Sequence, residues 1–261
     1  MSISLNEEIT IGDWFVYPRP APAAPVRLFC LPYAGGRASA YRSWPECLPD
    51  IEVAAIELPG RGSRFSHPPY QSMPDLVTAL ADAIGPQLTK PYAVFGHSLG
   101  ARIGFELARE VRRRAMPGPV VLFVSGCRAP HIPRIPYPRM AGLSERAFAR
   151  MLNQVGGAPL EVLDDPELFR VLRPALQADF TLADSYVYTD EPALPWPIRA
   201  FGGIVDSDAR EDTLLAWLAH TSSSFRLRRF AGGHFVVHTR QREYTDAIAA
   251  DLRLLGGTTQ T

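Results

Sequence analysis

One stretch of the sequence combines residues that could form a covalent bond with a substrate. Ser98 lies between Gly96 and Gly100 in the run FGHSLGA, after an apolar segment and before a helical pattern. A serine between two glycines at a strand-to-helix junction is typical of a nucleophile elbow, whose tight turn projects the hydroxyl group above a sheet. The glycines allow that turn because they carry no Cβ atom. We therefore predict that Ser98 is a nucleophile, with an ordinary glycine turn as the alternative.

A serine nucleophile needs a general base, and the base needs a carboxylate that holds it in the correct tautomer. In doubly wound hydrolases both partners follow the serine in the chain, each in a loop after a strand. Asp206 follows the apolar run IRAFGG, and His234 lies in the run GGHF after a later apolar run. We predict Asp206 as the orienting acid and His234 as the base. Asp208 remains an alternative acid because it lies in the same loop.

The other histidines fit the role of base less well. His97 is the direct neighbour of the serine in the tight turn, which directs its side chain away from the hydroxyl group. His238 lies at or near the start of the last helical pattern, where a surface or capping role is expected. Three more histidines have no supporting pattern and are expected at the surface: His67, His131 and His220.

Two glycine-rich loops are expected at the same edge of the sheet as the serine, where the strands end. The oxyanion hole of a nucleophile elbow uses the N–H group of the next residue, here Leu99, and a second N–H group from the loop after an early strand. That loop is LPYAGG, in which we predict Ala34 as the donor, with Tyr33 as the alternative and as a substrate contact. In the second loop, LPGRGSR, Arg61 and Arg64 could contact a substrate, but a turn with solvated arginines is the favoured interpretation.

The elements around these residues predict one α/β domain over residues 1–261. Short apolar strands alternate with amphipathic helices, which indicates a mostly parallel sheet covered on both faces. Ser72 and Asp75 form a capping box at one helix start, and residues 14–18 are expected to add an antiparallel edge strand. The other predicted strands are 26–31, 53–58, 92–96, 120–125, 198–202 and 225–230.

The alternation of strands and helices stops between residues 129 and 197. A proline-rich run is followed there by helical patterns, and the segment is too long for an ordinary connection. We predict a helical lid at residues 130–190, over the C-terminal ends of the strands. Its apolar side chains would line a substrate channel or only form the core of the lid itself; they are Phe148, Met151, Leu152, Phe169 and Phe180.

The composition argues against several classes of partner. The chain has 27 basic and 27 acidic residues, so no net charge attracts nucleic acid or an anionic membrane. Its three scattered cysteines fit neither a disulfide framework nor a zinc cluster. No apolar run approaches the roughly 18 residues of a membrane span, and the first residues do not resemble a secretory signal. We expect a soluble, cytoplasmic protein without metal or cofactor.

The runs LPYAGG, PGRGSR, FGHSLGA, ADF and GGHF occur in this order, and the combination resembles the type II thioesterases of polyketide synthases and nonribosomal peptide synthetases. The resemblance extends from about Leu28 to the last helix. It implies an α/β-hydrolase fold with a helical lid. It also implies hydrolysis of acyl groups from the phosphopantetheine arm of acyl or peptidyl carrier proteins, through an acyl-serine, so that aberrant or stalled groups are removed.

The resemblance places Ser98, Asp206 and His234 in the triad, and Leu99 and Ala34 at the oxyanion positions. The chain departs from the family in having Ser207 after the acid instead of a proline, which leaves the choice between the two aspartates open. Three other functions remain as alternatives. They are a general carboxylesterase or lipase, a medium-chain fatty acyl thioesterase with the same triad, and a carrier-binding protein without catalysis.

Overall fold

The computed structural model describes residues 8–133, 143–144, 147–148, 150 and 166–256. Within these residues the chain forms an eight-stranded sheet in the order β1-β2-β4-β3-β5-β6-β7-β8. Strands β4, β3, β5, β6, β7 and β8 run parallel to one another, whereas β2 pairs antiparallel with β4 and β1 pairs antiparallel with β2. The strands are β1 (Ile9–Ile11), β2 (Phe15–Tyr17), β3 (Val26–Leu31), β4 (Ile51–Ile56), β5 (Tyr92–His97), β6 (Leu122–Ser125), β7 (Ile198–Gly203) and β8 (Phe225–Phe230).

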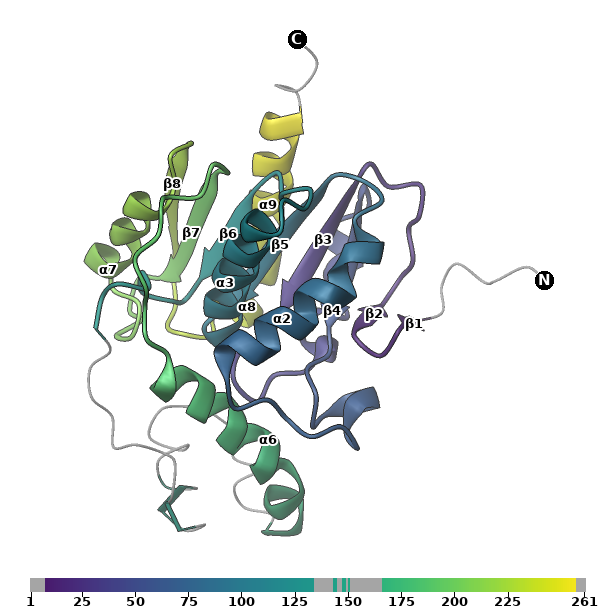
Figure 1. Ribbon diagram of the computed structural model, residues 1–261. Coiled ribbons are helices and arrows are strands. Elements are labelled where there is room, and N and C mark those ends of the chain that lie inside the picture. The colour runs from purple at the N-terminus through teal and green to yellow at the C-terminus, as the bar shows by residue number, and fades with distance from the viewer. Residues whose placement is uncertain (1–7, 134–142, 145–146, 149, 151–165, 257–261) are drawn as a thin grey trace, which may run out of the picture.

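Helices cover both faces of the sheet (Figure 1). Helices α2 and α3 lie on one face and α9 lies on the other. The described α-helices are α1 (Trp44–Cys47), α2 (Met73–Ile84), α3 (Leu99–Arg113), α6 (Pro166–Ser185), α7 (Glu211–Leu215), α8 (Val236–Thr239) and α9 (Gln241–Gly256). Short 3₁₀ helices are η1 (Ala38–Tyr41), η2 (Gly62–Arg64), η3 (Gly85–Gln87) and η4 (Ala216–His220).

Each face of the sheet has its own hydrophobic core. In β3, Phe29 and Leu31 point into the core under α2 and α3, whereas Leu28 and Cys30 point into the core under α9. All residues of β4 are buried, as expected for a parallel strand with helices on both sides. The two cores fix the parallel strands, whose C-terminal ends carry the loops of the site.

The predicted α/β architecture is confirmed, with small changes at the element ends. The strand predicted at 53–58 begins and ends two residues earlier, because Ile51 and Glu52 already pair with β3 and the pairing with β2 ends at Ile56. The strand predicted near residue 14 is antiparallel, but it is not the edge of the sheet because β1 pairs with its outer side. Ser72 caps α2 as predicted: its Oγ accepts the Asp75 N–H group at 3.4 Å.

Helix α6 is the described part of the predicted lid. It lies beyond the C-terminal ends of the parallel strands, apart from the sheet (Figure 1). Phe148, Phe169 and Phe180 are buried against one another, with ring centroids 6.1 Å apart in both pairs that include Phe148. Met151 and Leu152, which we predicted in the same lid, lie outside the described residues. None of the helices described here is long and apolar enough to cross a membrane.

Candidate active site

Ser98 occupies a strained turn between β5 and α3. Its φ of 54° and ψ of −117° lie outside the regions that residues with a Cβ atom usually adopt. The flanking positions have no room for a side chain: a Cβ atom on Gly96 would lie 2.2 Å from the carbonyl oxygen of Gly100. A Cβ atom on Gly100 would lie 2.2 Å from the Leu31 carbonyl oxygen. The sequence therefore folds here into the tight turn of a nucleophile elbow.

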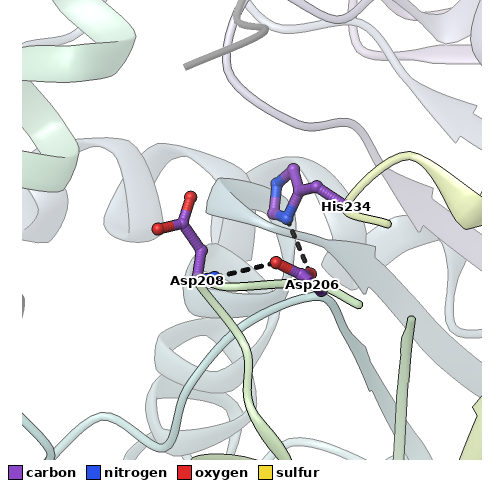
Figure 2. Close-up of side chains that lie close together, drawn as sticks. All are labelled: Asp206, Asp208 and His234. Carbon is purple, nitrogen blue, oxygen red and sulfur yellow. Dashed lines mark hydrogen bonds and ion pairs between the residues drawn. The ribbon is translucent and has the colours of Figure 1, made fainter. Parts of the chain in front are cut away.

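The next element of the site is a hydrogen-bonded Asp–His pair on two later loops (Figure 2). His234, in the loop after β8, places its Nδ1 2.9 Å from Oδ2 of Asp206, in the loop after β7. The other oxygen of Asp206 accepts the backbone N–H groups of Asp208 at 2.9 Å and of Ala209 at 3.3 Å. Asp208 thus contributes its backbone to the pair, while the carboxylate of Asp206 holds the histidine.

The surroundings of Asp206 favour its charged form. Burial acts to raise the pKa of this carboxyl group, but the hydrogen bond and charge of His234 and two backbone N–H groups outweigh burial and lower the pKa below its ordinary value. The buried carboxylate can therefore hold the N–H group of the imidazole ring and leave the opposite ring nitrogen for proton transfer. Asp208 is more exposed, at 35% of its side-chain surface, and lies near Arg128.

His97 points away from the cavity, into the core under α9. Its Nδ1 lies 2.9 Å from Ser125 Oγ, which in turn lies 3.3 Å from the Tyr244 hydroxyl. Burial lowers the pKa of His97 well below its ordinary value, and the charges of His234 and His238 act in the same direction. A neutral, fully buried imidazole ring supports the packing of the elbow and has no access to the Ser98 hydroxyl, in agreement with the sequence-based expectation.

The LPYAGG loop forms a tight turn beside the elbow. The Gly36 N–H group donates to the Tyr33 carbonyl at 2.8 Å, and Gly35 has the positive φ, 75°, that the third position of a type II turn requires. Within the described residues, no hydrogen bond uses the N–H group of Ala34. The same holds for Leu99, which is the first residue of α3 and has no partner within its helix. Both N–H groups are available to a ligand.

A cavity of about 370 Å³ joins these parts. Five predicted residues line it, Ala34, Ser98, Leu99, Phe180 and His234, and so does Asp208, the alternative acid. Ser98 and His234 both reach the cavity, although no hydrogen bond joins them within the described chain; such bonds are often long in ligand-free enzymes and shorten with substrate. Of the other predicted substrate contacts, Tyr33 and Phe148 do not line it, and Met151 lies outside the described residues. Tyr33 packs edge-on against Phe235, and Phe148 belongs to the core of the lid.

Several residues of the cavity wall were not predicted. Arg102 lies one helical turn after Ser98 on α3, and its guanidinium group stacks on the ring of Tyr186 at 4.6 Å. The spacing of four residues after the nucleophile could have identified Arg102, because residues i and i+4 share a helix face. Further lining residues follow β6, or lie within or after α6; they are Gly126, Cys127, Arg128, Pro130, His131, Ile132, Pro133, Ala183, Val187 and Tyr188.

Three polar side chains expected in solvent are buried instead. Arg61 is only 3% exposed because it forms a two-pronged ion pair with Asp179 of α6, at 2.6 and 2.7 Å. Arg64 is 6% exposed and stacks on the ring of Trp14 at 3.8 Å. The prediction of solvated arginines is therefore wrong. His220, predicted at the surface, is 5% exposed and lies 2.6 Å from a ring nitrogen of His131.

Asp206, Asp208 and His234 also have ligand atoms within 4.8 Å of one another, a spacing that could hold a metal ion. In the structure Asp206 and His234 use these atoms in their own hydrogen bond (Figure 2). A metal ion there would have to compete with this bond for the imidazole nitrogen. The absence of a metal requirement remains a prediction.

A mostly parallel sheet, a serine on a strained strand-to-helix turn and an Asp–His pair on two later loops define an α/β-hydrolase. Residues 26–253 match the family model described as a thioesterase domain. The gramicidin S biosynthesis protein GrsT of Aneurinibacillus migulanus is 39% identical over 246 residues, which cover 94% of this chain and 96% of that protein. The chain belongs to the thioesterase family.

Two solved structures refine the assignment. RedJ, a thioesterase from the prodiginine pathway of Streptomyces coelicolor, is 38% identical with a TM-score of 0.81, over 88% of this chain and 87% of that chain. The type II thioesterase BorB from the borrelidin biosynthetic cluster is 32% identical with a TM-score of 0.84, over 93% and 98%. The chain is accordingly a type II thioesterase, which confirms both the resemblance and the fold expected from the sequence.

Proposed function

We propose that the protein hydrolyses acyl thioesters carried on the phosphopantetheine arm of acyl or peptidyl carrier proteins. The observation that carries this proposal is the Asp206–His234 hydrogen bond of 2.9 Å beside a cavity that also contains Ser98. The names of relatives from antibiotic and prodiginine pathways support carrier-bound acyl groups as substrates. In this role the enzyme frees carrier proteins from aberrant or stalled acyl groups.

In the first half of the reaction, Ser98 attacks the carbonyl carbon of the thioester. His234 removes the hydroxyl proton through Nε2, because its Nδ1 is held by Asp206. The carbonyl oxygen becomes an oxyanion, and the free N–H groups of Leu99 and Ala34 are its donors. When the tetrahedral intermediate collapses, the C–S bond breaks, the histidine returns the proton to the pantetheine sulfur, and an acyl-serine remains.

In the second half, water replaces the thiol. His234 accepts a proton from a water molecule that attacks the acyl-serine carbonyl, and the same two N–H groups hold the new oxyanion. The C–O bond to Ser98 then breaks, the serine oxygen regains its proton from the histidine, and a free carboxylic acid leaves. The buried, charged Asp206 stabilises the imidazolium ion in both halves.

The strained turn at Ser98 also serves this mechanism. The serine is the last residue before α3, so its hydroxyl group and the Leu99 N–H group lie at the N-terminus of a 15-residue helix. The partial positive charge of that terminus favours a developing oxyanion. The elbow therefore supplies the nucleophile and one oxyanion donor from adjacent residues.

The decisive experiment compares two substrates with the same acyl group. One is the acyl group on a phosphopantetheinylated carrier protein, and the other is a simple phenyl ester, with the Ser98→Ala variant as the blank. Release that depends on Ser98 and favours the carrier supports the proposal. Rapid cleavage of the ester with an untouched carrier would indicate a general esterase, and no turnover of either substrate would indicate a binding protein without catalysis.

A further inference from the structure

Three distant segments of the chain meet at the carboxylate of Asp179, on helix α6. Its Oδ2 accepts the backbone N–H group of Gly35 at 2.7 Å and Nη1 of Arg61 at 2.6 Å. Its Oδ1 accepts Nη2 of Arg61 at 2.7 Å. Asp179 is 1% exposed and Arg61 is 3% exposed, so this ion pair is almost completely removed from solvent.

The same contacts fix the turn that contains Ala34. Arg61 also donates through Nη1 to the carbonyl oxygen of Gly36, at 3.1 Å. The Gly35 N–H group and the Gly36 carbonyl are thus both held by side chains from outside the turn, and the Gly36 N–H group is used within it. The N–H group of Ala34 remains without a partner in the described chain, and Ala34 lines the cavity.

The segment directly after helix α6 is anchored to α3. Tyr186 donates from its hydroxyl to Glu106 of α3 at 2.6 Å, and Arg102 stacks on its ring. Helix α6 and the residue after it therefore connect the oxyanion turn with the helix that begins after the nucleophile. A displacement of α6 at Asp179 would release the turn directly, because no other side chain accepts the Gly35 N–H group in the described structure.

We propose that Asp179 is a positioning residue that holds the oxyanion turn in its active geometry, with Arg61 orienting its carboxylate. The proposal rests on the proposed role of the Ala34 N–H group as an oxyanion donor. Asp179 acts through the turn and does not touch the substrate. It makes helix α6 of the lid part of the machinery that stabilises the transition state.

The expected effect follows from the role of the turn. Removal of one oxyanion donor typically lowers kcat by about 10²- to 10³-fold. A donor that is present but loosely held should lose part of that effect, so we expect Asp179→Asn to lower kcat by about 10- to 100-fold. KM should change by less than about 3-fold, because the ground-state carbonyl depends less on the turn than the oxyanion does.

If the Arg61–Asp179 ion pair only stabilised the fold, its loss would lower stability and not kcat. Two further variants distinguish this structural role from the positioning role. In the double variant Arg61→Met/Asp179→Leu, both buried charges are replaced by apolar groups, which generally preserves folding. The Gly35 N–H group still loses its acceptor, so kcat should stay low while the urea unfolding midpoint recovers. Asp251→Asn is the matched control: this aspartate is also 1% exposed and paired with arginines, but it lies on α9.

Three measurements are made for each variant: kcat and KM for an acyl carrier substrate, the urea concentration at the unfolding midpoint, and the affinity for a trifluoromethyl ketone. The ketone is an analogue of the acyl group, and its adduct with the serine carries an oxyanion. The proposal predicts weaker ketone binding for Asp179→Asn and for the double variant, in proportion to kcat, and unchanged binding for Asp251→Asn. Normal kcat in the folded double variant would overturn it. Should Asp179→Asn fail to fold, the double variant alone decides.

The failure of this proposal is distinguishable from the failure of the proposed function. If Ser98→Ala retains full carrier hydrolysis, the mechanism itself is wrong. If Ser98→Ala is inactive while the Asp179 variants keep wild-type kcat and ketone affinity, only the positioning role is wrong.

Discussion

The two loops that we propose to supply the nucleophile and the oxyanion donors are held in opposite ways. The elbow at Ser98 is held by its own backbone, since Gly96 and Gly100 lie against main-chain atoms that a side chain would displace. The turn at Ala34 is held by side chains from elsewhere, Asp179 and Arg61. The elbow should therefore be sensitive to changes within it, whereas the turn should be sensitive to a change more than a hundred residues away.

The strongest test of the elbow removes its hydroxyl group. Ser98→Ala should lower kcat by about 10⁶-fold, the loss found when a triad serine is removed, because no other group can form the acyl intermediate. Stability should change little, since alanine inherits the same backbone geometry. Steady-state hydrolysis of an acyl thioester and a urea titration measure both effects. Ser207→Ala, at an exposed position, is the control; an equal loss there would contradict the assignment.

The Asp–His pair gives the next largest effect. Asp206→Asn should lower kcat by about 10⁴-fold, because an amide cannot hold the histidine in the tautomer that accepts the serine proton. Asp208→Asn should cost less than about 10-fold, since Asp208 gives its backbone N–H group to the pair and asparagine keeps that group. The two variants are compared by kcat/KM at pH 7.5. A larger loss in Asp208→Asn would reverse the choice of acid.

A substitution at Gly100 connects the two loops. The added Cβ atom of Gly100→Ala would lie 2.2 Å from the Leu31 carbonyl oxygen and 2.6 Å from that of Pro32, at the start of the LPYAGG loop. Because a shift of these backbone atoms would disturb both loops, we expect the free energy of unfolding to fall by about 3 kcal/mol. The rate of serine labelling by a fluorophosphonate should fall at least about 100-fold.

Gly85→Ala is the matched control for this change. Its Cβ atom would meet only the end of the Met116 side chain, at 3.4 Å, and its φ is an ordinary −46°. Stability and labelling should therefore stay near wild type. If Gly85→Ala and Gly100→Ala behave alike, steric pressure from the backbone does not hold the elbow.

The same contrast explains which parts of the site the sequence predicts. The elbow, the Asp206 loop and the His234 loop are each encoded by a few adjacent residues, so local chemistry at a strand end identifies them. The fold is predictable for a similar reason, because strands and helices alternate with distinct apolar periods. Element ends and the position of β2 inside the sheet depend on pairing with β1, which the local pattern does not determine.

The ion pair between Arg61 and Asp179 could not be predicted from local sequence patterns, because it joins residues 118 positions apart. Nothing in the run PGRGSR distinguishes an arginine that will be buried from one that will be solvated. His220 was missed for the same reason: it packs against rings that are distant in the sequence, such as those of Phe105 and His131. Residues held by distant side chains are the ones that local sequence patterns misplace.

The His131–His220 contact is a further region held by side chains, and its stability should depend on pH. His220 is buried, and its pKa is lowered to about 4, first by burial and then by the charges of His131, Arg109 and Arg102, with Asp190 opposing them. Because the unfolded chain takes up this proton near pH 6.5, it binds more protons than the folded chain between about pH 6.5 and 4. Folding stability is therefore lost as the pH falls through this window.

The slope of that loss is measurable. Each group of this kind contributes about 1.4 kcal/mol per pH unit within its window, and buried His97, whose pKa is also lowered, acts in the same direction. Urea unfolding followed by tryptophan fluorescence at pH 7, 6 and 5 should show His220→Asn losing less stability per pH unit than wild type. Ser207→Ala, which removes no titratable group from an exposed position, should keep the wild-type slope. Parallel slopes for wild type and His220→Asn would show that the unfolding equilibrium does not depend on a proton taken up by His220.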